Sequence, residues 1–176
     1  MPIEVLDPAD TAQRADYERA FYAAFQRVPG NRLIRSLWLW DDSAGRIATR
    51  VPYEDQIVYL LRMRGALDGG LAVNVRLAQF QSAAYGFAPP ADLAGACEML
   101  AFFSVSDRRF AIKRRFLRDR FADLRARGFR TGYTTASSRL YGVYLHFGAQ
   151  LLDQAEIRGE QRYFLALDLS LICADR

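Results

Sequence analysis

The stretch from residue 97 to residue 152 constrains the fold more than any other part of the chain. Its first part, Cys97–Val105, is an apolar run with the length of a buried strand. The charged turn Ser106–Arg109 then leads into Ile112–Arg127, whose apolar residues recur every three to four positions and predict an amphipathic helix. A second strand is predicted at Arg130–Thr135. A strand that reaches a helix N-terminus through a tight turn makes an anion site, because the first helical N–H groups have no partner within the helix.

The rest of the chain predicts one mixed α/β domain, residues 1–176, with helices on both faces of its sheet. Helices are predicted at Thr11–Val28, Arg32–Trp40 and Ser138–Phe147. Strands are predicted at Ile3–Leu6, Ile57–Arg62, Leu71–Phe80, Ala149–Ile157 and Tyr163–Leu171, with a turn at Gly65–Gly70. The proline-containing segment Ser82–Gly95 predicts a long loop, and long loops in compact domains usually serve a function.

Composition and cysteine usage narrow the class of protein further. With 176 residues, of which 51% are hydrophobic and 25% charged, the chain is expected to form a hydrophobic core. It shows no signal peptide, and no apolar run approaches the ~20 residues that span a bilayer, so a cytoplasmic protein is expected. Cys97 and Cys173 lie far apart and the chain has a single histidine, which predicts two buried free thiols and no metal site.

Positive charge is concentrated in one part of the chain. Nine arginines and Lys113 lie between Arg108 and Arg130, against two aspartates, and the net charge of the chain is +4. Such a cluster suits an anionic partner, for example a phosphate, an acidic protein face or a nucleic acid. The solvated face of the predicted helix explains the same arginines equally well, so both interpretations stay open.

Two short motifs within residues 98–148 resemble those of the GCN5-related N-acetyltransferase (GNAT) superfamily. Members of that family open a helix with Gln/Arg-x-x-Gly-x-Gly/Ala, and the matching residues here are Arg108, Arg109, Phe110, Ala111, Ile112 and Lys113. They often carry Tyr-x-x-x-Gly-Phe farther on, where this chain has Tyr144, then Gly148 and Ala149. The element order over Ile57–Leu171 also agrees. The resemblance implies a GNAT-like acyl-CoA N-acyltransferase fold with a central, mixed, mostly antiparallel twisted sheet.

The resemblance implies an N-acyltransferase that moves an acyl group from a thioester donor to an amine of a small molecule or peptide. The expected co-substrate is acetyl-CoA or a longer acyl-CoA, although Ala111 and Lys113 stand where the family has small residues that let backbone N–H groups approach a pyrophosphate. Autoinducer synthases and long-chain N-acyl amino acid synthases take the acyl group from acyl carrier protein, and often have a glutamate at the place of Glu98. Carrier-protein phosphopantetheine is therefore the alternative donor, and the acidic surface of a carrier protein would match the basic helix.

The resemblance also assigns roles to individual residues. Tyr144 is the candidate general acid that returns a proton to the leaving thiolate, and its ordinary pKa of about 10 keeps it protonated. Glu98 is the candidate general base for the acceptor amine, and is expected to face solvent or a cleft because burial of an unpaired carboxylate is costly. Backbone groups of Phe103, Ser104 and Val105 are expected to hold the pantetheine arm, beside a strand bulge.

Aromatic residues outside the motifs are candidates for the acceptor pocket. Trp38, Tyr85 and Phe87 come from the predicted early helix and the long loop, and they favour an apolar acceptor or a long acyl chain. Packing in the core is the alternative interpretation of these three residues, and of Tyr144.

Two other classes of function stay open. A non-catalytic member of the fold would bind a ligand or partner without turnover, and the altered residues Ala111 and Lys113 support this class. Nucleic-acid binding through the basic helix is not favoured, because the helix must bury Ile112, Phe116 and Phe121 and no known nucleic-acid motif accompanies it. A homodimer formed through the terminal hairpin is a further hypothesis.

Overall fold

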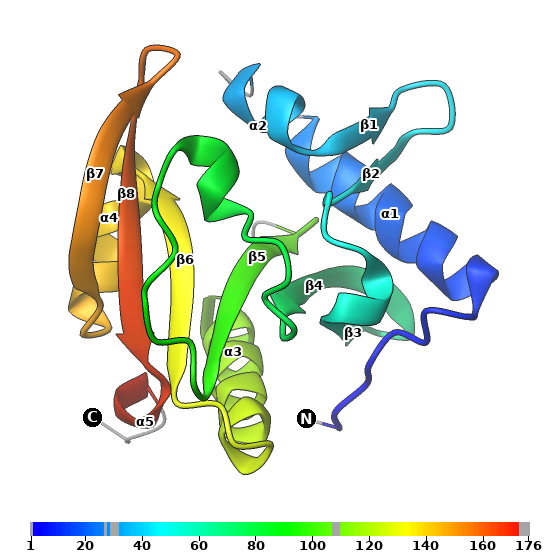
Figure 1. Ribbon diagram of the computed structural model, residues 1–176. Coiled ribbons are helices and arrows are strands. Elements are labelled where there is room, and N and C mark those ends of the chain that lie inside the picture. Colours follow the sequence, from blue (N-terminus) through cyan, green and yellow to red (C-terminus); the bar gives the residue numbers. More distant parts are fainter. Residues whose placement is uncertain (1, 27, 29–31, 107–109, 173–176) are drawn as a thin grey trace.

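The computed structural model describes residues 2–26, 28, 32–106 and 110–172. Its centre is a six-stranded sheet with the strand order β3-β4-β5-β6-β8-β7 (Figure 1). The strands are β3 (Gln56–Met63), β4 (Ala66–Asn74), β5 (Ala96–Ser104), β6 (Thr131–Ser137), β7 (Gln150–Ile157) and β8 (Glu160–Asp168). Neighbouring strands are antiparallel except β5 and β6, which are parallel. The mixed, mostly antiparallel sheet expected from the sequence is therefore confirmed.

Helices cover both faces of the sheet, as expected. One face, called the α3 face below, carries α3 (Phe110–Ala126), α4 (Ser138–His146) and α5 (Leu169–Ile172). The other, the α1 face, carries α1 (Thr11–Phe25), α2 (Arg32–Leu37) and the hairpin of β1 (Leu39–Asp41) and β2 (Arg46–Ala48). Two short 3-10 helices, η1 (Tyr53–Asp55) and η2 (Ser82–Tyr85), lie in the connections. None of the described helices is long and apolar enough to cross a membrane.

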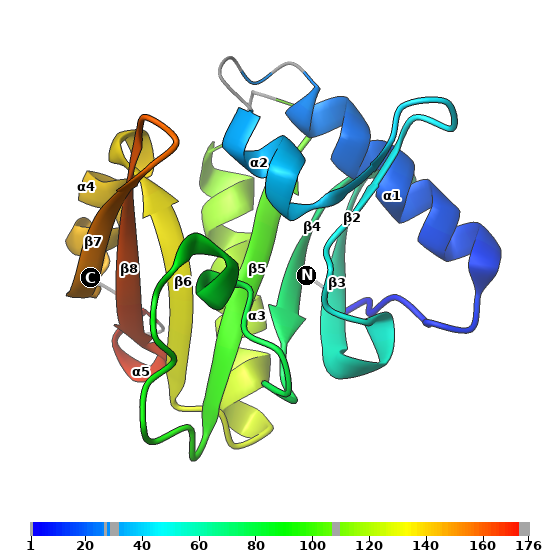
Figure 2. The same cartoon turned by 45° about the horizontal axis from the view of Figure 1, so that its top comes forward.

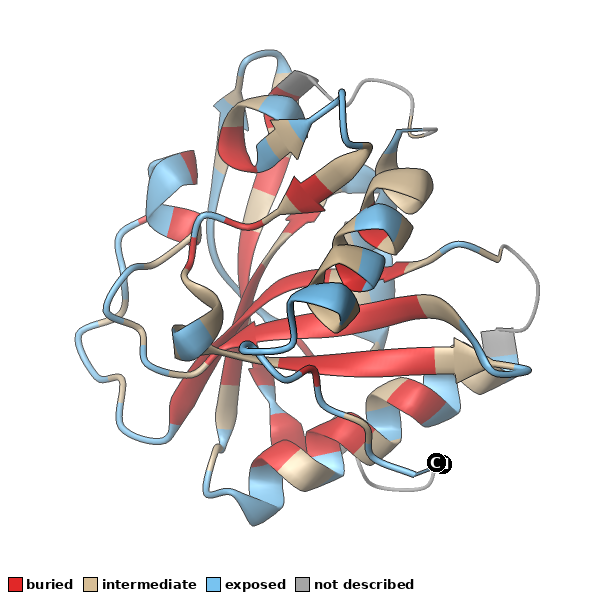
Figure 3. Ribbon diagram, turned by 90° about the vertical axis from the view of Figure 1, so that its right-hand side faces the viewer, coloured by how far each residue is buried: buried red, intermediate tan, exposed pale blue. Residues whose placement is uncertain are grey.

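Each face of the sheet has its own apolar cluster, because successive residues of a strand point to opposite sides. In β5, Leu100 and Phe103 join the cluster on the α1 face, whereas Cys97 and Met99 join the cluster on the α3 face. Figure 3 shows the buried residues gathered in the strands between the two helical layers. Cys97 is a buried free thiol, while Cys173 lies outside the described residues.

The strand predicted at Leu71–Phe80 is wrong beyond Asn74, where β4 ends. The Asn74 side chain folds the following residues into a turn. Its Oδ1 accepts a hydrogen bond from the Leu77 N–H at 3.0 Å, and its Nδ2 donates to the Gln79 carbonyl at 2.6 Å. An asparagine that bonds the backbone a few residues ahead favours a turn over a continued strand.

Three other predicted boundaries differ from the structure. The turn predicted at Gly65–Gly70 is shorter, because Arg64 and Gly65 adopt positive φ angles of 54° and 84° and β4 already begins at Ala66. The helix predicted at Arg32–Trp40 ends at Leu37, and the chain continues into β1. The last predicted strand stops at residue 168, where α5 begins, and the predicted strand at residues 3–6 makes only one isolated bridge to β3.

Candidate functional site

Strands β5 and β6 part from each other along their length. Their parallel ladder has three residue pairs, namely Ala96 with Thr131, Cys97 with Gly132, and Glu98 with Tyr133. Beyond these pairs the rest of β5, residues 99–104, diverges from residues 134–137 of β6, so that the two strands form a V (Figure 2). Each strand keeps its ladder to its outer neighbour, β4 or β8. The inner edges of the V therefore carry backbone groups without a strand partner, which is an arrangement that can receive an extended ligand.

A β-bulge in β5 lies directly beyond the apex of the V. Residues 73 and 72 of β4 face Met99 and Ala101, which leaves Leu100 as an extra residue. The Leu100 carbonyl accepts a hydrogen bond from Gln81 Nε2 at 2.9 Å. The Met99 carbonyl accepts one from Thr134 Oγ1 at 3.3 Å. Both carbonyls of the bulge are thus held by side chains, one from the loop after β4 and one from β6.

Tyr144 lies in α4 and is partly buried against the apolar cluster of the α3 face. The Thr134 side chain, which bonds the bulge, lies close enough to the Tyr144 hydroxyl to affect its pKa. Burial raises the pKa of Tyr144 above its ordinary value, and the Thr134 side chain offsets part of this rise. The structure therefore places a protonated phenol one side chain away from the bulge of β5.

The glycine of the Tyr144 motif has a structural explanation. Gly148 has a φ of 82° and follows the C-terminus of α4, where a left-handed residue commonly ends a helix. The Tyr144 carbonyl accepts hydrogen bonds from the Phe147 and Ala149 N–H groups, both at 3.0 Å. The spacing of four residues between the tyrosine and the glycine is thus the spacing of a helix end.

Glu98 is on the α1 face at the apex of the V, and only 1% of it is exposed. Its Oε1 accepts hydrogen bonds from the Ser82 N–H and the Ser82 hydroxyl, both at 2.7 Å. Its Oε2 accepts from the Gln81 N–H at 2.8 Å and from Asn74 Nδ2 at 3.3 Å. Burial raises the pKa of Glu98, and these hydrogen bonds oppose the rise. The expectation that Glu98 faces solvent or a cleft is wrong, because four donors compensate its burial.

The three aromatic residues predicted for the acceptor pocket lie on the same face as Glu98 and are buried in its apolar cluster. Trp38 donates its indole N–H to Gln81 Oε1 at 2.9 Å. The Tyr85 ring lies 5.8 Å from the guanidinium of Arg162. Phe87 stacks on a phenylalanine of β8 with ring centroids 5.5 Å apart. These three buried side chains pack in the apolar cluster on the α1 face of the sheet, and they are called the aromatic floor of that face below.

The predicted phosphate-binding segment is described only in part. Arg108 and Arg109 lie outside the described residues, as does the side chain of Phe110, at which α3 begins. Ala111 is exposed, and Lys113 is partly exposed. Ile112 packs against the cluster of the α3 face. Because α3 is the next element after β5 in the chain, its N-terminus lies toward the open end of the V, where β5 ends.

Asp68 anchors the chain where it leaves β5 toward α3. It is the extra residue of a second bulge, since residues 61 and 62 of β3 face residues 69 and 67 of β4. Its Oδ2 accepts hydrogen bonds from the Ser104 hydroxyl at 2.8 Å and the Ser106 hydroxyl at 2.9 Å. Its carbonyl accepts from the Val105 N–H at 2.6 Å. The N–H of Val105, a residue predicted to bind the pantetheine arm, is thus already bonded to β4. The side chain of Phe103, predicted for the same role, is buried and stacks on Phe21.

The surface of α3 is basic. Arg114, Arg115 and Arg118 are exposed, as the helical pattern predicts. Arg120 is different, because it is fully buried, donates through Nη2 to the Pro2 carbonyl at 2.8 Å and lies over the Phe116 ring. These three exposed arginines make this part of α3 basic, and two of them, Arg115 and Arg118, each lie 4.0 Å from a carboxylate oxygen of Asp119.

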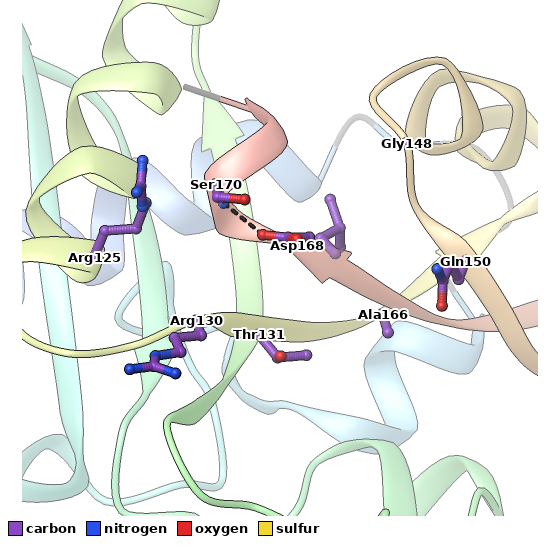
Figure 4. Close-up of a pocket in the computed structure, with 9 residues that line it drawn as sticks. Arg125, Arg130, Thr131, Gly148, Gln150, Ala166, Asp168 and Ser170 are labelled. Carbon is purple, nitrogen blue, oxygen red and sulfur yellow. Dashed lines mark hydrogen bonds between the residues drawn. The ribbon is translucent and has the colours of Figure 1, made fainter. Parts of the chain in front are cut away.

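A cavity of about 490 Å³ lies at the other end of the sheet, where β5 and β6 are still paired (Figure 4). Arg125, Arg130, Gln150, Asp168 and Ser170 are among its lining residues. None of the predicted site residues lines it. Among the described residues, no group of three or more His, Cys, Asp or Glu side chains could hold a metal ion.

The residues that hold the bulge could not be selected from the sequence. Thr134 lies within a predicted strand, and nothing in the strand pattern distinguishes it from Thr135. Gln81 lies between the predicted strand that ends at Phe80 and the predicted loop that begins at Ser82, where residue spacing carries no information about contacts. Ser82 and Asn74 acquire their roles only when the loop after β4 folds back onto Glu98.

No protein-family model matches the chain, and no curated protein matches it in sequence. Solved structures do resemble it. A CoA-dependent acyl-homoserine lactone synthase, BjaI, with SAM and isopentyl-CoA, has a TM-score of 0.69 at 14% identity, covering 97% of this chain and 85% of that one. An aminoglycoside 6'-acetyltransferase type Ii has a TM-score of 0.64 at 13% identity, covering 100% of this chain and 99% of that one. A protein described as a GNAT-family acetyltransferase from Desulfovibrio desulfuricans has a TM-score of 0.58 at 12% identity, covering 96% and 97%. The chain has the GNAT fold.

Proposed function

We propose that the protein is an N-acyltransferase that transfers an acyl group from an acyl-CoA thioester to the amine of a small-molecule or peptide acceptor. The observation that carries the proposal is the V between β5 and β6, with its bulge at Leu100 and with Tyr144 near Thr134, the residue that bonds the Met99 carbonyl at that bulge. An extended pantetheine arm carries amides that need backbone partners, and the inner edges of the V lack strand partners. The likeness to a CoA-dependent lactone synthase and to an aminoglycoside acetyltransferase supports this assignment.

In the proposed reaction the amine attacks the thioester carbonyl, and the carbon–sulfur bond then breaks. Tyr144 gives its phenolic proton to the departing thiolate, a role for which its raised pKa keeps it protonated. Glu98 accepts the proton that the amine loses. Because the carboxylate of Glu98 is enclosed, the proton would reach it through the Ser82 hydroxyl, which already donates to Oε1 at 2.7 Å. Holding the two reactants together in the V supplies the larger part of the rate.

An acylated carrier protein is the second candidate donor. The exposed arginines 114, 115 and 118 on α3 support it, because their charge would suit the acidic surface of a carrier protein. Its single phosphate would also demand less of the altered segment at Ala111 and Lys113 than a CoA pyrophosphate does.

Calorimetric titration tests the donor. Free CoA, acetyl-CoA, a long-chain acyl-CoA and an acylated carrier protein are titrated separately into the protein at low and moderate salt. Binding of a CoA form in the micromolar range supports the proposal, and binding of the carrier protein alone transfers it to the second donor. If none of the four binds, the acyltransferase proposal is refuted and a non-catalytic fold member takes its place.

Variants of two tyrosines on α4 test the chemistry. Tyr144→Phe is expected to lower turnover while donor affinity stays within twofold of the wild type. Tyr141→Phe is the matched control, because Tyr141 lies three residues earlier and stacks on Tyr163 with ring centroids 4.0 Å apart, a contact that phenylalanine keeps. Equal turnover in the two variants would remove Tyr144 from the mechanism.

A further inference from the structure

Gln81 connects three elements that meet at the apex of the V. Its backbone N–H donates to Glu98 Oε2 at 2.8 Å. Its side-chain Nε2 donates to the Leu100 carbonyl at 2.9 Å, and its Oε1 accepts from the Trp38 indole at 2.9 Å. One residue of the loop after β4 thus contacts the buried carboxylate, the bulge of β5 and the aromatic floor of the α1 face.

The contact with the bulge matters because a bulge interrupts the ladder with the neighbouring strand. A backbone carbonyl left out of a ladder and removed from water needs another donor. Gln81 supplies that donor for Leu100. Since a trans peptide is planar, holding the Leu100 carbonyl in one direction also sets the opposite direction for the N–H of Ala101. The carboxamide of Gln81 therefore sets the orientation of the whole peptide unit between Leu100 and Ala101, at the bulge of β5.

We propose that Gln81 is a positioning residue of the donor site. It holds the peptide between Leu100 and Ala101 in the orientation that receives the pantetheine arm, and it links this peptide to Trp38 on the acceptor side. The inference rests on the proposed function and extends it to a residue that touches neither reacting group. It implies that donor affinity depends on a side chain from the loop after β4, outside both GNAT-like motifs.

Three variants separate positioning from general stability. Gln81→Met keeps the length of the side chain and removes both of its hydrogen bonds. Gln81→Glu keeps an acceptor for Trp38, loses the donor to the Leu100 carbonyl and places there a carboxylate oxygen that repels this carbonyl. Gln79→Met is the matched control, because it is the same change at an exposed side chain two residues away.

The first readout is amide hydrogen exchange of the peptide that covers residues 99–101, measured without any ligand. The second is the dissociation constant of acetyl-CoA, with kcat and KM for the same donor. Gln81→Met and Gln81→Glu are both expected to speed exchange in residues 99–101 and to raise the dissociation constant and KM about tenfold, the equivalent of one hydrogen bond. The value of kcat is expected to stay within threefold, and Gln79→Met is expected to match the wild type.

Exchange and affinity within twofold of the wild type in both Gln81 variants would overturn the inference, and so would equal effects of Gln81→Met and Gln79→Met. If Gln81→Met does not fold, Gln81→Glu decides, since it preserves the contact with Trp38. If the wild type binds no CoA thioester, the proposed function has failed separately. The exchange of residues 99–101 then decides alone whether Gln81 orients the bulge.

Discussion

Replacement of Glu98 by glutamine changes one oxygen of the carboxylate into an NH2 group inside a cage of donors. Four donors converge on the carboxylate. Two of them, the backbone N–H of Gln81 and the Nδ2 group of Asn74, donate to Oε2 and are held in place by the surrounding structure. Asn74 is fixed because its Oδ1 accepts from Leu77 and its Nδ2 also donates to the Gln79 carbonyl. The new NH2 group therefore faces Ser82, whose hydroxyl can rotate to accept from it but whose backbone N–H cannot.

One buried backbone N–H is then left without an acceptor, at a cost of about 1–3 kcal/mol in the free energy of unfolding. The stability of the wild type, by contrast, depends on pH in a defined direction. Burial raises the pKa of Glu98, so the folded state binds a proton more tightly than the unfolded state does. The stability contributed by Glu98 is greatest at low pH and falls as the pH rises from the ordinary glutamate pKa of about 4.3 through the raised value. Glutamine has no such titration.

Urea unfolding of the wild type and of Glu98→Gln, followed by tryptophan fluorescence between about pH 5 and pH 8, measures this difference. The wild type is expected to be more stable at the acid end, and the gap between the two proteins is expected to narrow as the pH rises. A gap that stays constant, or that widens toward pH 8, would refute the description of Glu98 as a buried carboxylate with a raised pKa. Glu98→Gln that is more stable than the wild type at pH 5 would refute the donor cage.

Four further predictions concern single positions. Tyr144→Phe is expected to lower kcat about 100-fold, measured in a steady-state assay of thiol release, and an unchanged kcat would exclude general-acid catalysis by this residue. Gly69→Ala is expected to lower the free energy of unfolding by roughly 3 kcal/mol, because its Cβ would lie 2.2 Å from the Phe103 carbonyl oxygen of the neighbouring strand. Gly142→Ala in α4 is expected to raise the free energy of unfolding by about 0.5–1 kcal/mol, because nothing lies within 4 Å of the added Cβ. Equal urea midpoints for Gly69→Ala and Gly142→Ala would contradict both expectations. Burial raises the pKa of the Cys97 thiol to about 12, so mass-spectrometric mapping after alkylation at pH 8 is expected to find Cys97 unmodified in the folded protein and modified in urea, and labelling without urea would contradict its burial.

The fold could be predicted largely from periodicity. Strand-length apolar runs at residues 97–105 and 131–135 and the helical repeat between them correspond to β5, β6 and α3. The prediction failed where a side chain redirects the backbone. Asn74 ends β4 by bonding residues ahead of it, and such a bond leaves no periodic signal. The positive φ of Arg64 likewise moves a turn that glycine spacing had placed later.

The candidate site was predictable only where the resemblance supplied motif positions. Tyr144 and Glu98 were found in this way, although the spacing of Tyr144 from Gly148 is also that of a helix end. The enclosure of Glu98 could not be foreseen, since three of its four donors belong to Gln81 and Ser82, in a loop some sixteen residues earlier whose path depends on the assembled sheet. Gln81 and Thr134 were missed for the same reason.

The three-pair ladder between β5 and β6 divides the sheet into two antiparallel leaves, β3-β4-β5 and β6-β8-β7. The strands of each leaf are consecutive in the chain, so each leaf can pair its own strands before the other is in place. The ladder that joins the two leaves is the shortest in this sheet, and α3 is the segment of the chain that connects them. A ligand bound along the V would contact both leaves and so add to the few contacts between them. The separation of β5 and β6 beyond the three pairs would then set the width of ligand that fits between the leaves.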